Sequence, residues 1–504
     1  MTRSMTTRLS RTPSGFFAPY GGGWEQVPQP PRYLATSVQL PGIYPFGAGT
    51  GRPIDGAPLG QDMNTLSAVC TDHDALYRAN VISSPTGMLL GLNGLGKSST
   101  AQTLLGGQVG RGLTPVVFDP IKGEHIEWCT RMGSTVLSIG PRARHQLNLM
   151  SPGPLGYAAS RIGGTVGDEL MQLARAKSID LVKLVVKISR GTQDPVRDFE
   201  ETAIEAIVDT ILASASPTAV AVTADLVRAF EGPSLLMLQR TGLATVEEFH
   251  TEHKRLGQTL RALMTGDMGQ MLSGTNPVEI TPGNPGGLCF DTSSIHTGNT
   301  KLLSAAMLST WSLGMDAIDA HWELAQHELA IQAEAHANGD RYEPAVTWGG
   351  YTSLMDEFWY PIRACEGMVD LVDALSRTNR SVGTAELKVS HSPKDLLSLP
   401  NAADREKARG FIERSGLLML MGLSRDDLHE LAKVRPLTPK EISLVANFNQ
   451  AETWRGNRRT KGEKGTPPGA GKVLLKISER VGIPVKMLRT KTQMDAHNTD
   501  ERYQ

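Results

Sequence analysis

The sequence predicts an α/β protein with a mostly parallel, doubly wound sheet, and three observations lead to this fold class. A short apolar run at 88–90 precedes a glycine-rich loop, and a helical stretch at 98–105 follows the loop. A second buried, strand-like run lies at 114–118. Strand, loop, helix and strand in this order is how a parallel α/β sheet begins.

The glycine-rich loop is the most informative motif. Residues 91–98 read GLNGLGKS and fit G-x-x-x-x-G-K-[ST], the phosphate-binding P-loop. Its glycines let the backbone turn tightly and bring N–H groups onto phosphate oxygens. Lys97 can reach the β- and γ-phosphates, and the Ser98 hydroxyl can ligate Mg²⁺. The start of the next helix attracts the anion. The residues expected to bind the nucleoside triphosphate are Gly91, Leu92, Asn93, Gly94, Leu95, Gly96, Lys97, Ser98 and Ser99.

The rest of the chain is expected to complete this core around an insert. Residues 1–40 predict a flexible leader, and 41–164 hold the first part of the core. Helical spacing of apolar residues through 165–335 predicts a mostly helical insert. Residues 336–495 form the second part of the core and 496–504 a tail. Further expected strands are 135–139, 353–355, 383–389, 417–421, 473–477 and 484–488, and further helices are 223–230 and 259–271.

Composition narrows the function classes. The net charge of −1 makes the whole chain no obvious polyanion binder, but 452–491 holds eleven Lys or Arg against three Glu. This excess of eight positive charges is either a solvated surface or a contact for nucleic acid or an anionic membrane. The four cysteines form no C-x-x-C pair, which indicates a reduced, cytoplasmic protein without a zinc site. No run of about 18 apolar residues exists, so we expect membrane association through partners.

A P-loop needs an acidic partner, because Mg²⁺ prefers hard oxygen ligands and an attacking water needs a base. The segment YTSLMDE predicts a strand that places Asp356 near the metal's water shell and lets Glu357 polarise the water. Asp291 is the rival, because it ends a more apolar run but lacks a following Glu. An ordinary surface pair of acids is the third possibility.

Other candidates are less specific. The turn 119–125 follows the strand after the P-loop helix, where ligands bind in parallel sheets, but it also fits a simple solvated turn. Arg377 or Arg380 could stabilise transition-state charge, including from a neighbouring subunit, although surface arginines are common. His391 could sense a γ-phosphate, although a lone histidine is more often structural.

Taken together, these segments resemble a known family. GLNGLGKSS is followed by VVFDPIKGEH, LNLMSP, LMDEFW, LSRTNRSVGTAELKVSHSPKDL and the tail motifs LTPKEISLV, PGAGKVLLKI and GIPVKMLRT. This order resembles the TraC-type conjugative-transfer and type IV secretion motor ATPases of the FtsK–HerA superfamily. Their second strand ends in an Asp-Pro-Lys-Gly-Glu-Tyr-like turn, and an Asn-Pro-Leu-like motif follows, here Asn148-Leu149-Met150.

The resemblance implies a RecA-like P-loop NTPase core with a helical insert, using ATP and Mg²⁺. It supports Asp356 as a metal residue, Glu357 as the base and a role for Glu124. It also implies a homo-oligomer, a ring of six, in which Arg377 or Arg380 completes the neighbour's site. The motor would be cytoplasmic and peripheral at the inner face of the membrane, working with membrane-embedded channel components and possible DNA contact through 452–491.

Two departures from the family pattern matter. Ser390-His391 stands where the family has a Thr-Gln pair, so the γ-phosphate sensor is in doubt. The family's large N-terminal domain is expected to be missing or cut short, with its role supplied by another chain. Two other functions stay open: a translocase that grips duplex DNA directly, and an assembly factor that binds ATP without turnover, against which an intact Glu357 argues.

Overall fold

The computed structural model describes residues 11–12, 15–16, 53–191, 193–215, 220–274, 278–363, 369, 372–373, 383–399, 401–449, 469–491 and 493. The chain divides into two compact units, Met1–Gly51 and Arg52–Gln504. In the first unit, β1 (Arg11–Thr12) pairs antiparallel with β2 (Gly15–Phe16). All that follows concerns the second unit.

An eleven-stranded sheet forms the centre of the described part of this unit, in the order β4-β3-β13-β12-β11-β5-β10-β9-β6-β8-β7. Neighbouring strands from β11 to β7 all run parallel, whereas β12, β13, β3 and β4 continue the sheet antiparallel. The strands are β3 (Pro58–Asp62), β4 (Ala68–Cys70), β5 (Thr86–Leu90), β6 (Thr114–Asp119), β7 (Thr135–Ser138), β8 (Leu288–Asp291), β9 (Tyr351–Met355), β10 (Thr384–Ser390), β11 (Leu417–Leu420), β12 (Lys472–Ile477) and β13 (Ile483–Met487). The predicted α/β class with a mostly parallel sheet is confirmed.

Helices cover the sheet and extend beyond it. Around the sheet lie α2 (His73–Arg78), α3 (Lys97–Val109), α4 (Ile126–Arg131), α14 (Trp359–Ile362), α16 (Lys394–Leu397), α17 (Ala402–Arg414), α18 (Arg425–Ala432) and α19 (Pro439–Asn447). The remaining described helices are α5 (Gly153–Ile162), α6 (Gly164–Arg190), α7 (Asp198–Ser214), α8 (Asp225–Glu231), α9 (Leu235–Thr241), α10 (Val246–Glu252), α11 (Lys254–Leu263), α12 (Gly266–Leu272) and α13 (Thr300–Ala337). None of these described helices is long and apolar enough to cross a membrane.

Alternation along the strands places apolar side chains on both faces of the sheet. Met88 and Leu90 of β5 join a core cluster with α13, α17 and α18, whereas Leu89 joins a second cluster with α3 and α4. A strand that is buried on both faces has a continuous run of apolar residues, and residues 88–90 of β5, Met-Leu-Leu, form such a run. The sheet is therefore a layer between helices, and its carboxyl edge stays available for a site.

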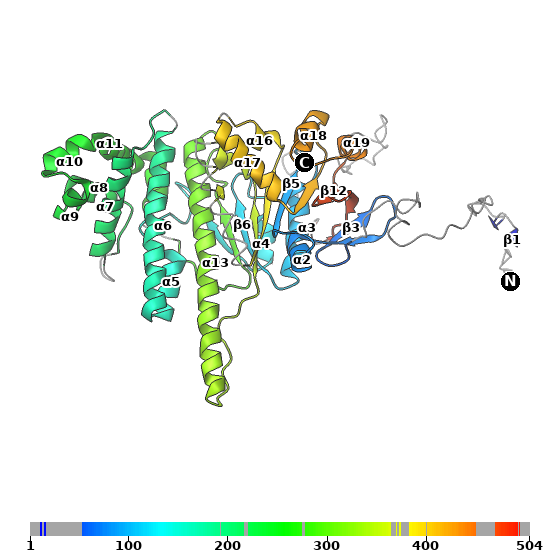
Figure 1. The fold of residues 1–504 in the computed structure, drawn as a ribbon, viewed down its shortest axis with the longest axis horizontal. Coiled ribbons are helices and arrows are strands. Elements are labelled where there is room, and N and C mark those ends of the chain that lie inside the picture. The colour runs from blue at the N-terminus through cyan, green and yellow to red at the C-terminus, as the bar shows by residue number, and fades with distance from the viewer. Residues whose placement is uncertain are drawn as a thin grey trace, which may run out of the picture. The chain divides into compact units, whose positions relative to one another are not determined.

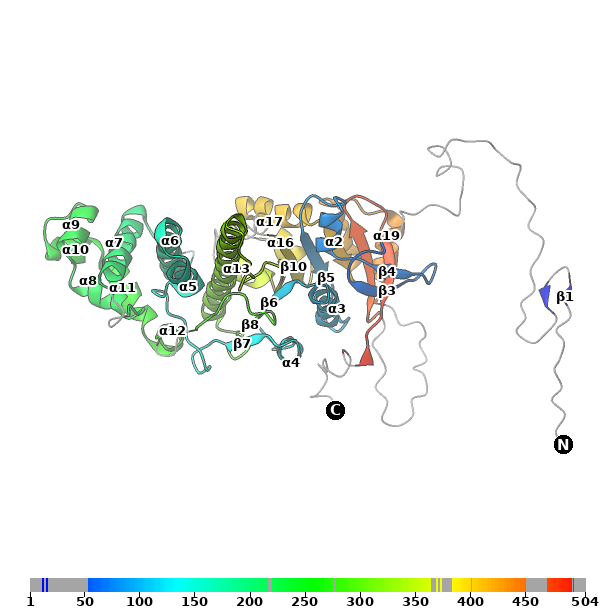
Figure 2. The same ribbon diagram turned by 90° about the horizontal axis from the view of Figure 1, so that it is seen from below.

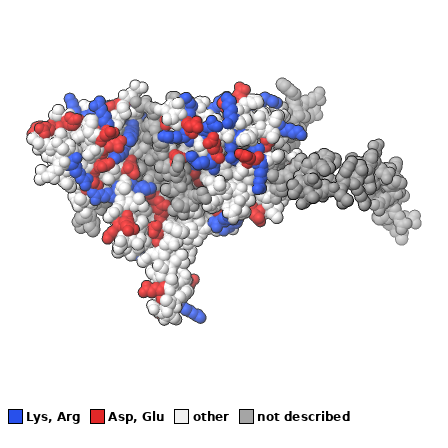
Figure 3. Space-filling model, viewed as in Figure 1, with Lys and Arg blue, Asp and Glu red and all other residues white. Residues whose placement is uncertain are grey.

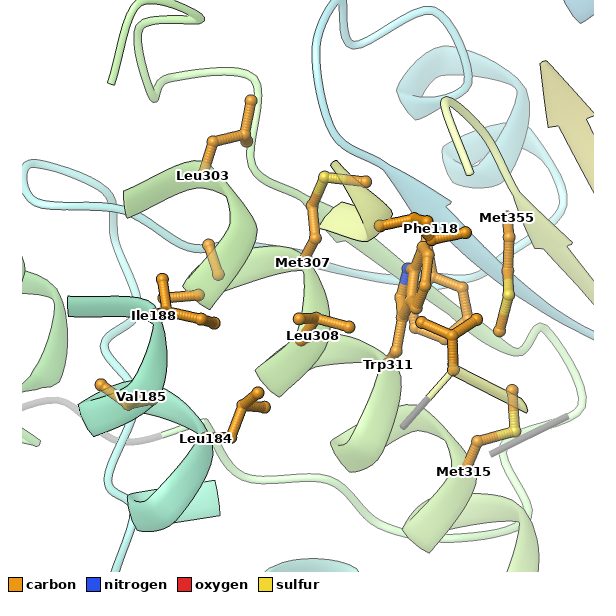
Figure 4. Packing of buried hydrophobic residues seen from close by; sticks show 14 of the residues in the cluster. Phe118, Leu184, Val185, Ile188, Leu303, Met307, Leu308, Trp311, Met315 and Met355 are labelled. Atoms are coloured by element: carbon orange, nitrogen blue, oxygen red, sulfur yellow. The ribbon is translucent and has the colours of Figure 1, made fainter. Parts of the chain in front are cut away.

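Within the expected insert, 165–335, β8 belongs to the sheet and α13 lies next to it, whereas the helices from α6 to α11 lie to one side of the sheet beyond α13. Both views show α5 and α6 beside α13 and the group α7–α11 farther out (Figures 1 and 2). The end of α13 projects beyond the rest in Figure 1. Figure 4 shows Leu184 and Ile188 of α6 directed toward Leu308 of α13. The ring of Trp311, one turn along α13, lies 6.2 Å from that of Phe118 in β6. The insert is thus joined to the strands through a continuous apolar core.

The expected strands all form, and no end differs from the expected one by more than two residues. Two helix predictions were wrong in detail. Helix α3 does not end at residue 105 but continues through two glycines to Val109, and Gly107 permits close packing there: a Cβ would come within 2.3 Å of the Cβ of Ala57. The run 259–271 is two helices, α11 and α12, with Thr265 between them in an extended conformation.

Candidate active site

The P-loop lies between β5, which ends at Leu90, and α3, which begins at Lys97. Gly94 and Gly96 have φ of 79° and 90°, a region that favours glycine. A Cβ at Gly94 would meet nothing within 4 Å, so the space in front of the loop is open. Here an anion could accept hydrogen bonds from the backbone N–H groups at the start of α3.

The strand order brings the Asp-Glu pair to the P-loop. Strand β10 lies between β5 and β9, and His391 follows β10 at the same edge. Lys97 Nζ donates to Asn93 Oδ1 at 3.1 Å and lies 2.9 Å from His391 Nδ1. His391 Nε2 lies 3.0 Å from Glu357 Oε2. The structure therefore joins Lys97 to Glu357 through one imidazole.

Glu357 is held in an unusual backbone conformation, with φ of 48°. A non-glycine residue keeps such a conformation only where the surroundings fix it, and such residues cluster at active sites. Trp359 Nε1 donates to Glu357 Oε2 at 2.7 Å, and the Phe358 N–H donates to the Val389 carbonyl at 3.0 Å. The buried ring of Phe358 stacks on Trp311 at 5.9 Å. The apolar core thus anchors the residue next to the acid.

Asp356 belongs to a buried network with His125 and Asp119. His125 Nε2 lies 3.2 Å from Asp356 Oδ2, and the backbone N–H of His125 donates to Asp119 Oδ2 at 2.6 Å. Burial opposes the charged imidazole, but the hydrogen bond to Asp356 and the charge of Asp119 outweigh it and raise the pKa of His125 to about 9. Burial alone would raise the pKa of Asp356, yet His125 lowers it. Burial also raises the pKa of Asp119 to about 6.

Ser98 and Glu124 are in direct contact. The Ser98 hydroxyl donates to Glu124 Oε2, and Lys122 Nζ lies 3.4 Å from the other carboxylate oxygen. Gln102, one turn along α3, donates from Nε2 to the Glu124 carbonyl at 3.0 Å. The turn after β6 is therefore fastened to the first two turns of α3, as expected if it serves the same site.

The donor set fits Mg²⁺ beside bound phosphate. Ser98, Glu124 and Asp356 offer hydroxyl and carboxylate oxygens, the ligands that this ion prefers, next to open space at the P-loop. Burial lowers the pKa of Lys97, and the nearby charges of Glu357 and Asp356 counteract it. The Lys97 ammonium, which lies near these carboxylates, can exchange them for phosphate oxygens.

Two further sequence candidates occupy other positions. Asp291 ends β8, next to β6, where it accepts hydrogen bonds from the Ser138 and Ser293 hydroxyls at 3.0 and 2.6 Å. Asn148 donates to the Ala221 carbonyl at 2.8 Å, so the expected Asn-Leu-Met motif attaches the core to the segment before α8. Neither contact involves the P-loop.

Arg377 and Arg380 lie outside the described residues, as do 452–468 of the basic region. On the face drawn in Figure 3, Lys and Arg are interspersed with Asp and Glu over the described surface.

Sequence reasoning missed three groups at this site. Trp359 holds Glu357, His125 holds Asp356, and Arg489 Nη1 donates to Ser99 Oγ at 2.7 Å. His125 is the last residue of the turn 119–125 that the sequence singled out, and its titratable side chain was a usable signal for the second group. Arg489 follows β13, almost 400 residues from Ser99, and no local pattern indicates that contact.

Comparison with solved structures identifies proteins with a similar fold. The chain is similar to VirB4 of Thermoanaerobacter pseudethanolicus, with a TM-score of 0.58 and 16% identity over 88% of this chain and 100% of that chain. The plasmid coupling protein TrwB in complex with ADP and Mg²⁺ matches with a TM-score of 0.48 and 12% identity, over 85% of this chain and 90% of TrwB. No protein-family model and no curated protein sequence matches the chain. The likeness to VirB4 shows that the two chains share a fold, in agreement with the predicted α/β core.

Proposed function

We propose that this chain is an ATP-hydrolysing motor that energises DNA or protein transfer through a type IV secretion or conjugation apparatus. The observation that carries the proposal is the meeting of Lys97 and Glu357 through His391, on a sheet that has the fold of VirB4. The motor would work in the cytoplasm, at the inner face of the membrane, with channel components as partners.

Each residue would have a defined task in hydrolysis. Lys97 would bind the β- and γ-phosphates and stabilise the charge that develops there. Mg²⁺, held by Ser98 and through water by Asp356, would neutralise phosphate charge. Glu357 would accept a proton from the attacking water. Glu124, which bonds to Ser98, would orient that hydroxyl.

The test is ATP hydrolysis by Lys97→Ala and Glu357→Gln proteins. We expect Lys97→Ala to lose nucleotide binding and Glu357→Gln to bind ATP but hydrolyse it about 100-fold more slowly or worse. Glu127→Gln is the matched control, because this carboxylate lies exposed on α4 and pairs with Arg131. Wild-type rates in both site variants would show that the assignment is wrong.

The proposed ring of six subunits needs an arginine that acts across an interface. We expect that one of the two variants, Arg377→Ala or Arg380→Ala, hydrolyses no ATP on its own. Mixing it with inactive Lys97→Ala subunits should restore hydrolysis, because some interfaces then combine an intact P-loop with an intact arginine. Native mass measured with ATP and Mg²⁺ gives the number of subunits.

A direct DNA translocase is the second candidate, favoured by the excess of eight positive charges in 452–491. Duplex DNA should then stimulate hydrolysis, and the stimulation should fall steeply with salt because bound counterions are released. Absence of stimulation, with co-purification of membrane components, supports the secretion motor instead.

A further inference from the structure

The two nitrogens of His391 have different roles that their partners fix. A lysine ammonium only donates hydrogen bonds, so Nδ1 of His391 accepts from Lys97 at 2.9 Å. The proton of the neutral ring then lies on Nε2, which donates to Glu357 Oε2 at 3.0 Å. One tautomer therefore satisfies both neighbours.

The same contacts occupy one carboxylate oxygen of Glu357. Oε2 accepts from His391 Nε2 and also from Trp359 Nε1 at 2.7 Å. A carboxylate oxygen has two lone pairs in its plane, so two donors fill the accepting capacity of Oε2. As long as both donors are in place, this oxygen of Glu357 cannot also accept a hydrogen bond from water.

The geometry points to His391 as a positioning residue that ties the catalytic glutamate to the P-loop lysine and releases it when nucleotide phosphates take the lysine. This inference rests on the proposed ATPase site. Phosphate oxygens that draw Lys97 away leave the Nδ1 lone pair facing anionic oxygens. That repulsion turns the ring, which ends the donation from Nε2 to Glu357. Occupation of the phosphate site thereby frees the base.

The surroundings allow the side chain to move while the backbone stays fixed. The His391 side chain is 25% exposed, so it can rotate toward solvent. Its neighbours are both fastened to Asp395, because the Ser390 hydroxyl donates at 3.1 Å and the Ser392 N–H at 2.9 Å. Rotation of one side chain at a fixed end of β10 is a two-state element of the kind that couples a ligand to a distant group.

The hydrogen-bonded bridge from Lys97 through His391 to Glu357 also opposes nucleotide binding, because a nucleotide must break the bond between Lys97 and His391. We expect His391→Phe, which keeps a ring of similar size, to bind ADP with Mg²⁺ about fivefold more tightly than wild type, the equivalent of one net hydrogen bond. His391→Gln is the matched control. Its amide can accept from Lys97 and donate to Glu357, so affinity should stay near the wild-type value.

The measurement is titration calorimetry of the full chain with ADP and Mg²⁺. Unchanged or weaker binding by His391→Phe, relative to wild type and His391→Gln, would overturn the proposal. If the Phe variant does not fold, ¹⁵N NMR of the histidine rings gives a second test. His391 should be neutral with its proton on Nε2, and ADP should change that signal; a ring that ADP does not affect contradicts the bridge. Both experiments remain decisive even if the wild type hydrolyses no ATP, an outcome that refutes only the proposed function.

Discussion

The two ends of helix α3 carry buried polar networks of opposite kinds. Its C-terminal end lies in a closed network, in which Gln108 donates to Asp72 Oδ1 at 3.2 Å and accepts from the Thr352 hydroxyl at 2.6 Å. Asp72 also accepts from the Ala75 N–H at 2.8 Å and from Arg111 at 2.5 Å. With a further bond from the Ala57 N–H at 2.8 Å, its two oxygens have four donors, which fills their capacity.

At the N-terminal end of α3, which we call the open end, the hydrogen-bond partners of the helix residues are exchangeable; the C-terminal end is the closed end. Lys97 bonds to the side chains of Asn93 and His391, and Ser98 bonds to Glu124, which is only partly buried. Phosphate oxygens and a metal ion can replace each of these partners. A saturated network therefore stabilises the fold, whereas a network with replaceable partners leaves this end of the helix able to bind phosphate and a metal ion. Substitutions at the C-terminal end should therefore change stability, and those at the N-terminal end should change catalysis or nucleotide binding.

The largest expected effect is on stability at the closed end. Asp72→Ala removes the acceptor of two backbone N–H groups and of Nη1 of Arg111, whose Nη2 still pairs with Asp74, and it should lower the free energy of unfolding by about 3–5 kcal/mol. Urea unfolding measures it. The control Thr245→Ala removes an exposed N-cap of α10 and should cost about 1 kcal/mol. A cost for Asp72→Ala no greater than for this control would contradict a closed network.

A second effect at the closed end depends on pH. His73 is fully buried beside Asp72, and burial lowers its pKa to about 4 although neighbouring carboxylates oppose the shift. The unfolded chain takes up this proton near pH 6.5, so stability is complete above that pH and is lost as pH falls toward 4. The free energy of unfolding should fall by about 3 kcal/mol over this pH range. His73→Gln should flatten the stability curve between pH 6.5 and 4, and an unchanged slope would refute the assignment.

The same contrast explains how much the sequence could predict. The P-loop, the Asp356-Glu357 pair and the strands are local patterns, because apolar runs and glycine spacing follow from backbone geometry. The bridge through His391 depends on β10 lying between β5 and β9, a pairing that no local pattern specifies. The closed network likewise joins Asp72 to Gln108 and Thr352, which are far apart along the chain. Partners of this kind are fixed by topology.

At the open end, the effect should fall on catalysis and leave stability unchanged. Ser98→Ala removes a hydroxyl that bonds to Glu124 and that would ligate Mg²⁺ in the proposed function, so kcat/KM for ATP should fall about 100-fold, or about 2.7 kcal/mol of transition-state binding. The free energy of unfolding should change by less than about 0.5 kcal/mol. Ser160→Ala, which removes an exposed hydroxyl on α5, is the control for both measurements. A large loss of stability in Ser98→Ala would remove the distinction between the two ends.

The smallest expected effect concerns Arg489, which touches the open end from β13. Its Nη1 donates to the Ser99 hydroxyl at 2.7 Å, and no carboxylate of the described residues pairs with it. A cation beside the first turn of α3 attracts phosphate, so Arg489→Ala should weaken ADP binding about fivefold, or about 1 kcal/mol. Arg489→Lys should keep part of the affinity because it keeps the charge. The loss should shrink at high salt, which screens charges near the surface. Equal affinity of all three proteins at low salt would mean that Arg489 only packs against Ser99, and that the open end of α3 binds phosphate through Lys97 and the loop backbone alone.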